Sequence, residues 1–477
     1  MNTTPDQILD INDALVSDEN PARENGTLDY ERCARLHNYI VACGWMAHHG
    51  QYTPDLDAIA SRRWYSGMDD EHIQATRERL TSPLISFLDL IYESEQEFFY
   101  WVEGLSIQSC DDSFLAEDNE LEDEGKSRFI VIYLTHVDFG SHCLGVVYDQ
   151  QLHRASFPMT IENCESVEPV DEHDDLWFPL ETILTNWIHM IDLGKVVPGL
   201  YVPDGSDYPT SRSQTGLWSW LPYCDAQVDS TIATMERYSA AVESRMPPDS
   251  LLSISAPLFT DADLDAAAVP QDCFIRSLLT RLKTPRFKFI APGLEVPHDK
   301  EAFARRQKFA HIPSEKDSIP GVLLFAAPDR TVNLNHEIRW LFNTAHENFT
   351  MNDGDPVPTG LYSEPTCRSN SDSEEAGFRL LLPFALRPDY SDQAARTSDG
   401  GLVAAGSFTQ LFQHGFHPFG GEWRSQRLER LFQRWTELIE AGVWIVGPEG
   451  VEGGIDKFRD ADNGNDAWMD YCIAPYW

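Results

Sequence analysis

The chain of 477 residues is long enough for two or three domains, and its 42% hydrophobic and 11% aromatic content excludes a disordered protein. Its 77 acidic residues against 36 basic ones give a net charge of −41, a field that repels nucleic acids and anionic membranes at long range. The sequence contains no run of about 20 apolar residues, so we expect no membrane partner.

The nine cysteines are scattered along the chain and none forms a C-x-x-C pair. This usage is typical of reduced, mostly buried thiols in an intracellular protein. The N-terminal stretch MNTTPDQILDIND has neither a basic region nor an apolar one, so it is no signal peptide. We therefore expect a cytoplasmic protein.

The first 200 residues begin with helices and continue into strands. Apolar residues at helical spacing predict helices over about 29–47 and 69–103. Three short strands, RFIVIYLTHV, HCLGVVYD and HRASFPMT, follow and are joined by short turns, which predicts an antiparallel meander. Pro179 and Gly194 then flank a regular apolar stripe, as expected for the first turn and the end of a helix.

The second half of the chain mixes helices and strands in the same way. Periodicity predicts helices and strands in this order along the chain: helices at 225–246 and 264–283, strands at 287–296 and 321–327, a helix at 334–349, a strand at 378–386, a helix at 424–441, and strands at 443–446 and 471–477. The segment 351–377 is rich in Ser, Thr, Pro and acids, and it reads as a long flexible loop.

These elements predict an α+β fold with mixed, largely antiparallel sheets packed against amphipathic helices. The polar stretch VPDGSDYPTSRSQTG suggests a boundary near its start. We therefore predict an N-terminal α+β domain over 1–205, which contains the three-strand meander, and a C-terminal α+β domain over 206–477, which contains the flexible loop at 351–377.

Several short strings resemble metal or catalytic motifs but lack an essential residue. DADLD at 261–265 starts like a calcium loop, but Ala266 stands where the sharp turn needs Gly. Thr260 is better explained as the cap of a helix whose first turn is acidic. HExxH, G-x-S-x-G and G-x-G-x-x-G are all missing. We therefore expect no metal and no cofactor.

One segment reverses the charge of the chain. Residues 276–308 contain nine bases and three acids, with phenylalanines between them. Bases interleaved with aromatic rings can bind a phosphate or single-stranded RNA, whereas the alternative is that these bases pair with the protein's own acids. The candidate phosphate- or RNA-binding residues, including two from the final helix, are Arg281, Lys283, Arg286, Lys288, Arg305, Arg306, Arg424 and Arg427.

The string QHGFHPFGGEW at 413–423 precedes the final helix. Gly415 and Pro418 argue against a helical zinc pair of His414 and His417, and the sequence offers no third ligand at matching spacing. A structural turn is one interpretation of the string. The other is a catalytic role for His414, His417 and Glu422, because a helix start offers N–H groups to an anion or oxyanion.

Two strings, WFPLETILTNWIHMIDLGKV and RLERLFQRWTELIEAGVWIVGPEGVEGGIDKF, resemble those of fungal specialised-metabolism proteins, among them the arginine-containing cyclodipeptide synthases. No diagnostic residue of that family is matched, so no site is transferred. The resemblance implies acyl transfer that joins arginine to a second amino acid, with aminoacyl-tRNA as the source. An acidic pocket would suit the guanidinium group of such a cationic substrate.

We therefore expect an enzyme that acts on a cationic, amino-acid-type or aminoacyl substrate, with tRNA as a candidate partner. The alternative from a different class is a non-catalytic acidic protein, whose acidic loops bind a basic partner. A pocket with convergent polar groups would favour the enzyme, and a flat acidic face would favour the binding protein.

Overall fold

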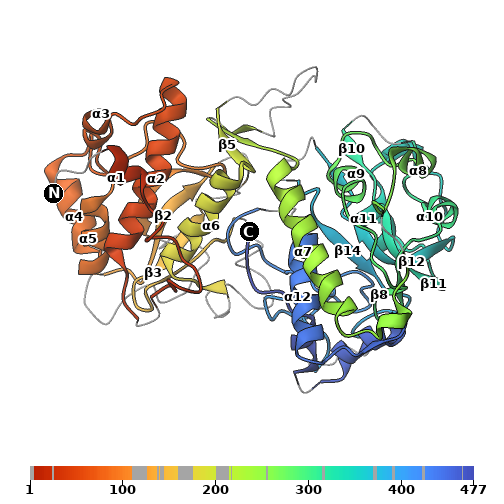
Figure 1. The fold of residues 1–477 in the computed structure, drawn as a ribbon. Helices are drawn as coiled ribbons and strands as arrows, with labels where there is room; N and C mark the ends of the chain where they lie inside the picture. The colour runs from red at the N-terminus through yellow and green to blue at the C-terminus, as the bar shows by residue number, and fades with distance from the viewer. Residues whose placement is uncertain are drawn as a thin grey trace. The chain divides into compact units, whose positions relative to one another are not determined.

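The computed structural model describes residues 5–23, 26–109, 126–136, 139, 144–159, 176–199, 214–215, 217–253, 256–313, 317–368, 373–388, 393–421, 425–464 and 466–477. The chain forms two compact units. Unit 1 comprises Met1–Leu221, Phe416–Glu422 and Tyr476–Trp477, and unit 2 comprises Pro222–Gly415 and Trp423–Pro475. Both combine helices with mostly antiparallel sheets, so the predicted α+β class is confirmed (Figure 1). The boundary expected at 205/206 lies outside the described residues.

Unit 1 contains both helices and short strands. Its elements are α1 (Pro5–Leu9), α2 (Tyr30–His49), α3 (Leu56–Ala60), α4 (Asp70–Glu78), α5 (Ser82–Leu90), β1 (Val102–Ser109), β2 (Phe129–Thr135), β3 (Gly145–Asp149), β4 (Arg154–Ser156), α6 (Leu180–Leu193), β5 (Val196–Pro198), β6 (Gln214–Thr215) and β7 (Trp218–Trp220).

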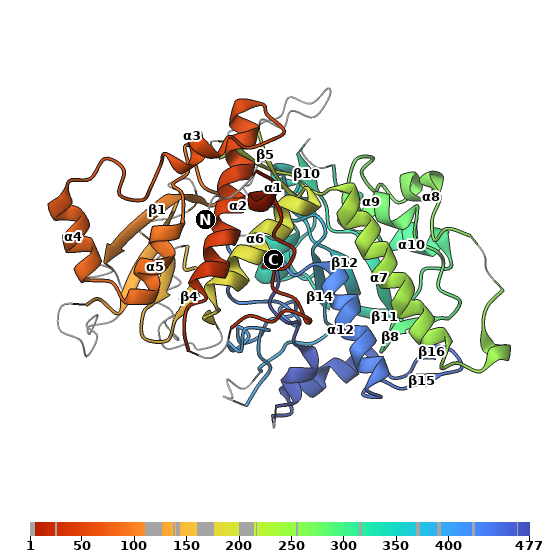
Figure 2. The ribbon, with the colours of Figure 1, turned by 60° about the vertical axis from the view of Figure 1, so that its left-hand side comes forward.

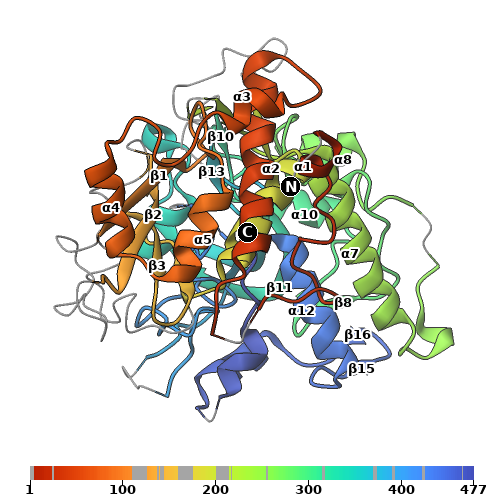
Figure 3. The same ribbon diagram turned by 90° about the vertical axis from the view of Figure 1, so that its left-hand side faces the viewer.

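The long helix α2 begins and ends where its sequence provides caps. The Asp29 side chain accepts a hydrogen bond from the Arg32 backbone N–H, and Gly50 adopts the left-handed conformation that ends the helix. Its apolar face packs against α5 and α6, and Figure 3 shows α5 beside it. Helix α6 likewise starts after Pro179 and ends at Gly194, as the sequence predicts.

Strands β1 to β4 form an antiparallel sheet in sequence order. Three of these strands lie where the alternating pattern puts them. The fourth, β1, falls at the end of the segment 69–103 and just beyond it, and that segment was predicted to be helical as one block. This prediction is wrong because α4 ends at Glu78, a second helix starts at Ser82 with Pro83 in its first turn, and it ends at Leu90, before the extended Ile91.

The core of unit 1 is rich in aromatic rings. Trp187 of α6 stacks on Phe99 with centroids 5.0 Å apart, and Phe98 stacks on Tyr133 of β2 at 4.9 Å. Two segments distant in the sequence complete this core, because Phe419 and Trp477 are both buried in it. Unit 1 is therefore not a continuous stretch of chain.

Unit 2 contains the remaining elements. They are α7 (Asp225–Glu243), η4 (Pro248–Ser250), α8 (Asp261–Ala266), α9 (Phe274–Leu279), β8 (Phe289–Ala291), β9 (Leu294–Glu295), α10 (Lys300–Arg306), β10 (Ser318–Ile319), β11 (Leu323–Asn333), α11 (His336–Phe342), η5 (His346–Asn348), β12 (Pro356–Ser363), β13 (Thr366–Cys367), β14 (Phe378–Leu381), α12 (Leu428–Glu440), β15 (Val446–Gly447), β16 (Gly450–Val451), η6 (Ile455–Asp462) and η7 (Ala467–Tyr471).

Within the described residues, the main sheet of unit 2 has the order β14-β12-β11-β9-β8-β16-β15. All its pairings are antiparallel except that of β16 with β8, so the predicted mixed, largely antiparallel sheet is confirmed. Helices α7 and α12 lie side by side (Figures 1 and 2). The predicted stripe of α12, which includes Leu431, Phe432 and Trp435, is buried.

Segment 351–377 is not one long loop, which corrects the sequence prediction. It contains β12, which pairs with both β11 and β14, and the short strand β13. The prolines misled the prediction, but Pro356 is the first residue of its strand and Pro358 lies beside an irregularity in the β11 register. Proline is tolerated at such positions because no ladder N–H is needed there.

The ends of other elements also differ from expectation. The predicted strand at 471–477 is absent, since η7 runs to Tyr471 and the following described residues form no strand. The sequence YCIAPYW alternates like a strand, but Trp477 turns instead to Asn186 of α6, whose side chain accepts from the Trp477 backbone N–H at 3.2 Å.

No helix in the described part of the chain is long and apolar enough to cross a membrane.

Candidate functional site

The three residues predicted to be catalytic are divided between the two units and the part of the chain outside the described residues. His414 belongs to unit 2 and His417 to unit 1. Glu422 lies outside the described residues. The Gly415 backbone N–H between the histidines donates to Asp399 at 3.0 Å, which fixes the turn. The catalytic assignment of this trio stays a prediction.

The second half of the same segment has a structural role in unit 1. Phe419 is 1% exposed, and its carbonyl accepts a hydrogen bond from the Trp187 indole N–H at 2.8 Å. Gly420 has a φ of 100°, and a Cβ there would lie 2.6 Å from the Trp101 ring and 2.8 Å from Phe157. Only glycine fits this position, so packing explains Gly420, and Gly421 likewise has a positive φ, of 105°.

Three of the predicted phosphate-binding bases face acids on α7. Lys283 Nζ lies 2.8 Å from Glu236, Arg286 lies 3.7 Å from Glu243, and Arg281 pairs with Asp229. These acids are spaced by seven residues along α7. Two helical turns separate each from the next, so the three carboxylates lie on one face. The three bases are thus matched by three acids of the same unit, and we call these three ion pairs the ladder along α7.

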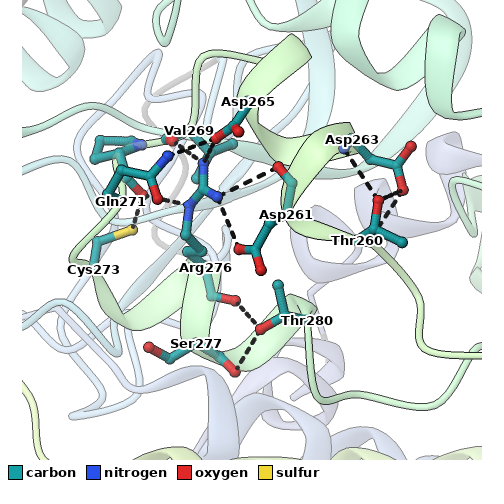
Figure 4. A network of polar contacts seen from close by, with 11 residues as sticks. Thr260, Asp261, Asp263, Asp265, Val269, Gln271, Cys273, Arg276, Ser277 and Thr280 are labelled. Carbon is teal, nitrogen blue, oxygen red and sulfur yellow. Dashed lines mark hydrogen bonds and ion pairs between the residues drawn. The ribbon is translucent and has the colours of Figure 1, made fainter.

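Arg276, the first base of the segment, is buried and holds two helices together (Figure 4). Its guanidinium donates to Asp261 at 3.0 Å and Asp265 at 2.7 Å in α8, and to the carbonyls of Val269 and Pro270. The predicted cap is present beside it, since Thr260 and Asp263 exchange the hydrogen bonds of a capping box. DADLD is therefore a helix start.

The other predicted bases have mixed surroundings. Lys288 lies 3.5 Å from Glu295, and Arg305 lies 3.6 Å from Glu301 one turn earlier in α10. Arg427 is buried at the start of α12 and lies 3.7 Å from Glu429. Arg424 lies outside the described residues. Such pairing leaves less free charge for a phosphate than the sequence suggests.

Arg306 differs from its neighbours. It is half-buried at the end of α10, and it has no hydrogen-bond or ion-pair partner among the described residues. It borders a cavity of about 540 Å³ in unit 2, a volume typical of small-molecule sites. Of the predicted bases, Lys288 also lines this cavity.

The cavity has an apolar floor and a polar rim. Its floor consists of buried side chains from α10, β11 and the segments around β8 and β9: Phe287, Val296, Phe303, Leu323, Leu324 and Ala326. The rim contains the charged groups and one imidazole: Lys288, Glu295, His298, Asp299, Arg306 and Glu449. An apolar floor with a few polar groups is the usual form of a ligand site.

Hydrogen bonds fix several groups on this rim. The Asp299 carboxylate accepts from the Ala302 backbone N–H at 2.9 Å and caps α10. Gln307 bonds both the N–H and the carbonyl of Leu323, at 2.9 and 3.0 Å, and so holds the end of α10 on β11. His298 Nε2 donates to the Phe287 carbonyl at 2.9 Å. In the neutral ring, Nδ1 is then the acceptor.

Two rim charges lack a side-chain partner in the described part of the chain. Lys288 and Glu295 pair with each other, and Asp299 caps its helix, which leaves the Arg306 guanidinium and the Glu449 carboxylate. The Glu449 backbone carbonyl accepts from the N–H groups of Lys288 and Phe289, which fixes the turn that presents its side chain. One cavity thus offers an unpaired cation and an unpaired anion.

Sequence reasoning identified Arg306 and Lys288 but missed His298, Glu449 and the apolar floor. Glu449 lies in the turn between β15 and β16, 143 positions after Arg306, so no local spacing connects them. PHDK, which contains His298, matched no motif. A buried apolar run with charges at its ends was the one available signal, and it is too common to identify a site.

No family model, no curated protein and no solved structure matches the chain. The resemblance to arginine-containing cyclodipeptide synthases therefore stays a prediction. The acidic stretches at 111–124 and 162–175 lie outside the described residues, so the alternative of an acidic protein that binds a basic partner stays a prediction too.

Proposed function

We propose that unit 2 binds a small zwitterion of amino-acid type in the cavity beside α10. The observation that supports this is the pair of unpaired rim charges, Arg306 and Glu449, around an apolar floor. Arg306 would take the carboxylate, because a guanidinium matches its two oxygens, and Glu449 would take the ammonium group. The apolar floor would accept the side chain.

We further propose that the protein is an enzyme that acts on this substrate. His298 is the rim group suited to accept a proton from the substrate ammonium, because its Nε2–H is committed to the Phe287 carbonyl and Nδ1 is the free acceptor. Deprotonation makes the amine a nucleophile, which is what acyl transfer to nitrogen requires. The ion pairs along α7 favour a free amino acid over tRNA as the partner of this segment.

A calorimetric titration with leucine, phenylalanine and arginine tests the binding proposal. Arg306→Met should weaken binding by roughly 10–100-fold, since a charge-assisted hydrogen bond contributes about 1.5–3 kcal/mol. Arg305→Met is the matched control, because Arg305 is the adjacent residue, is more exposed and faces Glu301. It should leave binding unchanged.

Analogues that lack one charge make the test specific. An amine without the carboxylate should bind Arg306→Met and the wild type equally. An acid without the amine should bind Glu449→Gln and the wild type equally. If none of the three amino acids binds, or if Arg305→Met weakens binding as much as Arg306→Met, the proposal is wrong.

The specific expectation from the sequence, tRNA-dependent formation of an arginine-containing cyclodipeptide, has its own test. The purified protein is mixed with arginine, ATP, tRNA and aminoacyl-tRNA synthetases, and products are sought by mass spectrometry. A cyclic dipeptide, lost in His298→Asn, would support both the reaction and the base. No product, together with no tRNA binding at low salt, would exclude it.

A further inference from the structure

The last turn of α2 brings two adjacent histidines, His48 and His49, against Glu95, which lies between α5 and β1 of the same unit. One ring nitrogen from each histidine and one carboxylate oxygen all lie within 4.8 Å of one another. His49 Nε2 is 3.0 Å from Glu95 Oε2. No other group of three such side chains among the described residues comes this close.

Adjacent residues of a helix normally point about 100° apart, so a converging His-His pair needs a local cause. Here α2 ends directly after the pair, at Gly50, which has a φ of 61°. The Trp45 ring, one turn earlier, supports His49 with centroids 4.4 Å apart, and the two histidine rings meet edge to face at 4.9 Å. The end of the helix and the tryptophan hold the rings together.

We infer that His48, His49 and Glu95 bind one divalent transition-metal ion, with zinc as the best-suited ion and water completing the coordination. Two imidazoles and a carboxylate are typical zinc ligands, whereas magnesium and calcium prefer oxygen alone. Ligands at about 2.0–2.2 Å from a tetrahedral ion lie roughly 3.4 Å apart, so the three side chains need only small movements.

One feature near the three side chains favours the binding of a cation, and another opposes it. The carbonyl end of α2 carries partial negative charge, which attracts a cation. Arg62 opposes the binding of a cation, because its positive charge acts on both Glu95 and Glu93. The groups are exposed, so water can fill the remaining positions. This is an accessible site that exchanges its ion with solution.

A bound ion would connect the end of α2 to the segment that enters the aromatic core. Glu95 is three residues before Phe98 and six before Trp101, both of which are buried. Binding to the folded state alone stabilises a protein in proportion to the logarithm of ion concentration. Zinc should therefore raise the melting temperature of the protein.

The test uses the whole chain, from which any histidine tag has been removed. The protein is treated with chelator and then titrated with Zn²⁺ by calorimetry and with Co²⁺ by visible absorption. We expect one ion per chain. His48→Ala, His49→Ala and Glu95→Gln should each weaken binding at least about tenfold, since even outer-sphere substitutions cost roughly 10–100-fold. They should also remove the zinc-dependent rise in melting temperature.

His72→Ala is the matched control. His72 is an exposed histidine of unit 1 that lies 2.7 Å from Asp69 but has no third ligand at comparable distance among the described residues. Its substitution should leave binding unchanged, and circular dichroism should show that all four variants are folded. Unsaturable binding, or affinity that survives in the three site variants, would overturn the inference.

Discussion

The interior around α2 in unit 1 and the interior beside β14 in unit 2 both bury polar side chains, but those of unit 1 are uncharged and those of unit 2 form an ion pair. In unit 1, His37 is buried and neutral, because its Nε2 donates to the Tyr92 carbonyl at 2.7 Å and its Nδ1 accepts from the Tyr133 hydroxyl at 2.8 Å. In unit 2, Arg379 of β14 makes two hydrogen bonds to Glu364, at 2.6 and 3.0 Å.

These two kinds of buried group make the two units sensitive to different changes. A buried neutral imidazole is penalised when acid would charge it, and burial lowers the pKa of His37 to about 4. A buried ion pair is penalised when one partner is lost, since the other charge then stays without compensation. Burial raises the pKa of Glu364, which Arg379 opposes. Unit 1 should therefore be sensitive to pH and unit 2 to truncation of the pair.

The largest expected effect is that of Arg379→Met in unit 2. It leaves Glu364, whose side chain is 7% exposed, without its guanidinium partner. We expect a loss of about 3–5 kcal/mol in the free energy of unfolding, measured by urea denaturation at pH 7.

The double variant Arg379→Met with Glu364→Gln is the control, and it should recover part of this loss because no buried charge remains. The loss in Arg379→Met should also shrink as pH falls. A raised pKa means that the folded state binds the proton more tightly, so acid favours it. A loss that is unchanged between pH 7 and pH 4.5 would contradict a buried charge as its cause.

The second effect is the acid sensitivity of unit 1. The pKa of His37 is about 4 in the folded protein against 6.5 normally, so between these values the unfolded chain binds a proton and the folded chain does not. This group therefore lowers the free energy of unfolding as pH falls from about 6.5 to 4. The loss approaches about 3 kcal/mol.

Measurement of unfolding from pH 7 to 4 in the wild type and in His37→Gln checks this. Glutamine cannot titrate, so the variant should lose stability less steeply over the window, although it is less stable at pH 7. Equal slopes would show that His37 does not titrate in this range.

The smallest expected effect concerns the ladder along α7. The Lys283 side chain is 79% exposed, and its pair with Glu236 lies in water. Lys283→Met should change the free energy of unfolding by less than about 1 kcal/mol, because exposed ion pairs contribute little. Glu236→Gln is the matched change on the other side, and the double variant should show near-additive effects. A coupling above about 1 kcal/mol would mean that the ladder acts as a network.

The elements with strong local signals were predictable. Helices α6 and α12 begin or end near the residues that their caps and stripes indicate, and the start of α8 follows from Thr260 and its acidic first turn. The segment at 351–377 was not predictable, because its polar composition hides β12, whose partners β11 and β14 lie on either side of it in the sheet. Pairing with distant strands outweighed local propensity there.

The residues of the candidate sites were likewise predictable only in part. Composition located the basic segment and included Arg306, but it did not distinguish Arg306 from Arg281 or Lys283, whose acids are 52 and 47 positions away. His48 and His49 are adjacent in the sequence, yet their third partner is 46 residues from His49 and offers no metal motif. Spacing finds a site only when its members share one element.

The fold class, the helices with clear stripes and caps, and the excess of acid can be predicted from the sequence, because they depend on neighbouring residues and on composition. Only the folded chain shows which bases are neutralised, which charges remain around the α10 cavity, and why Phe419 and Gly420 are needed in unit 1. Those outcomes depend on contacts between residues far apart in the chain, where burial and the local partner set the energy of each charge.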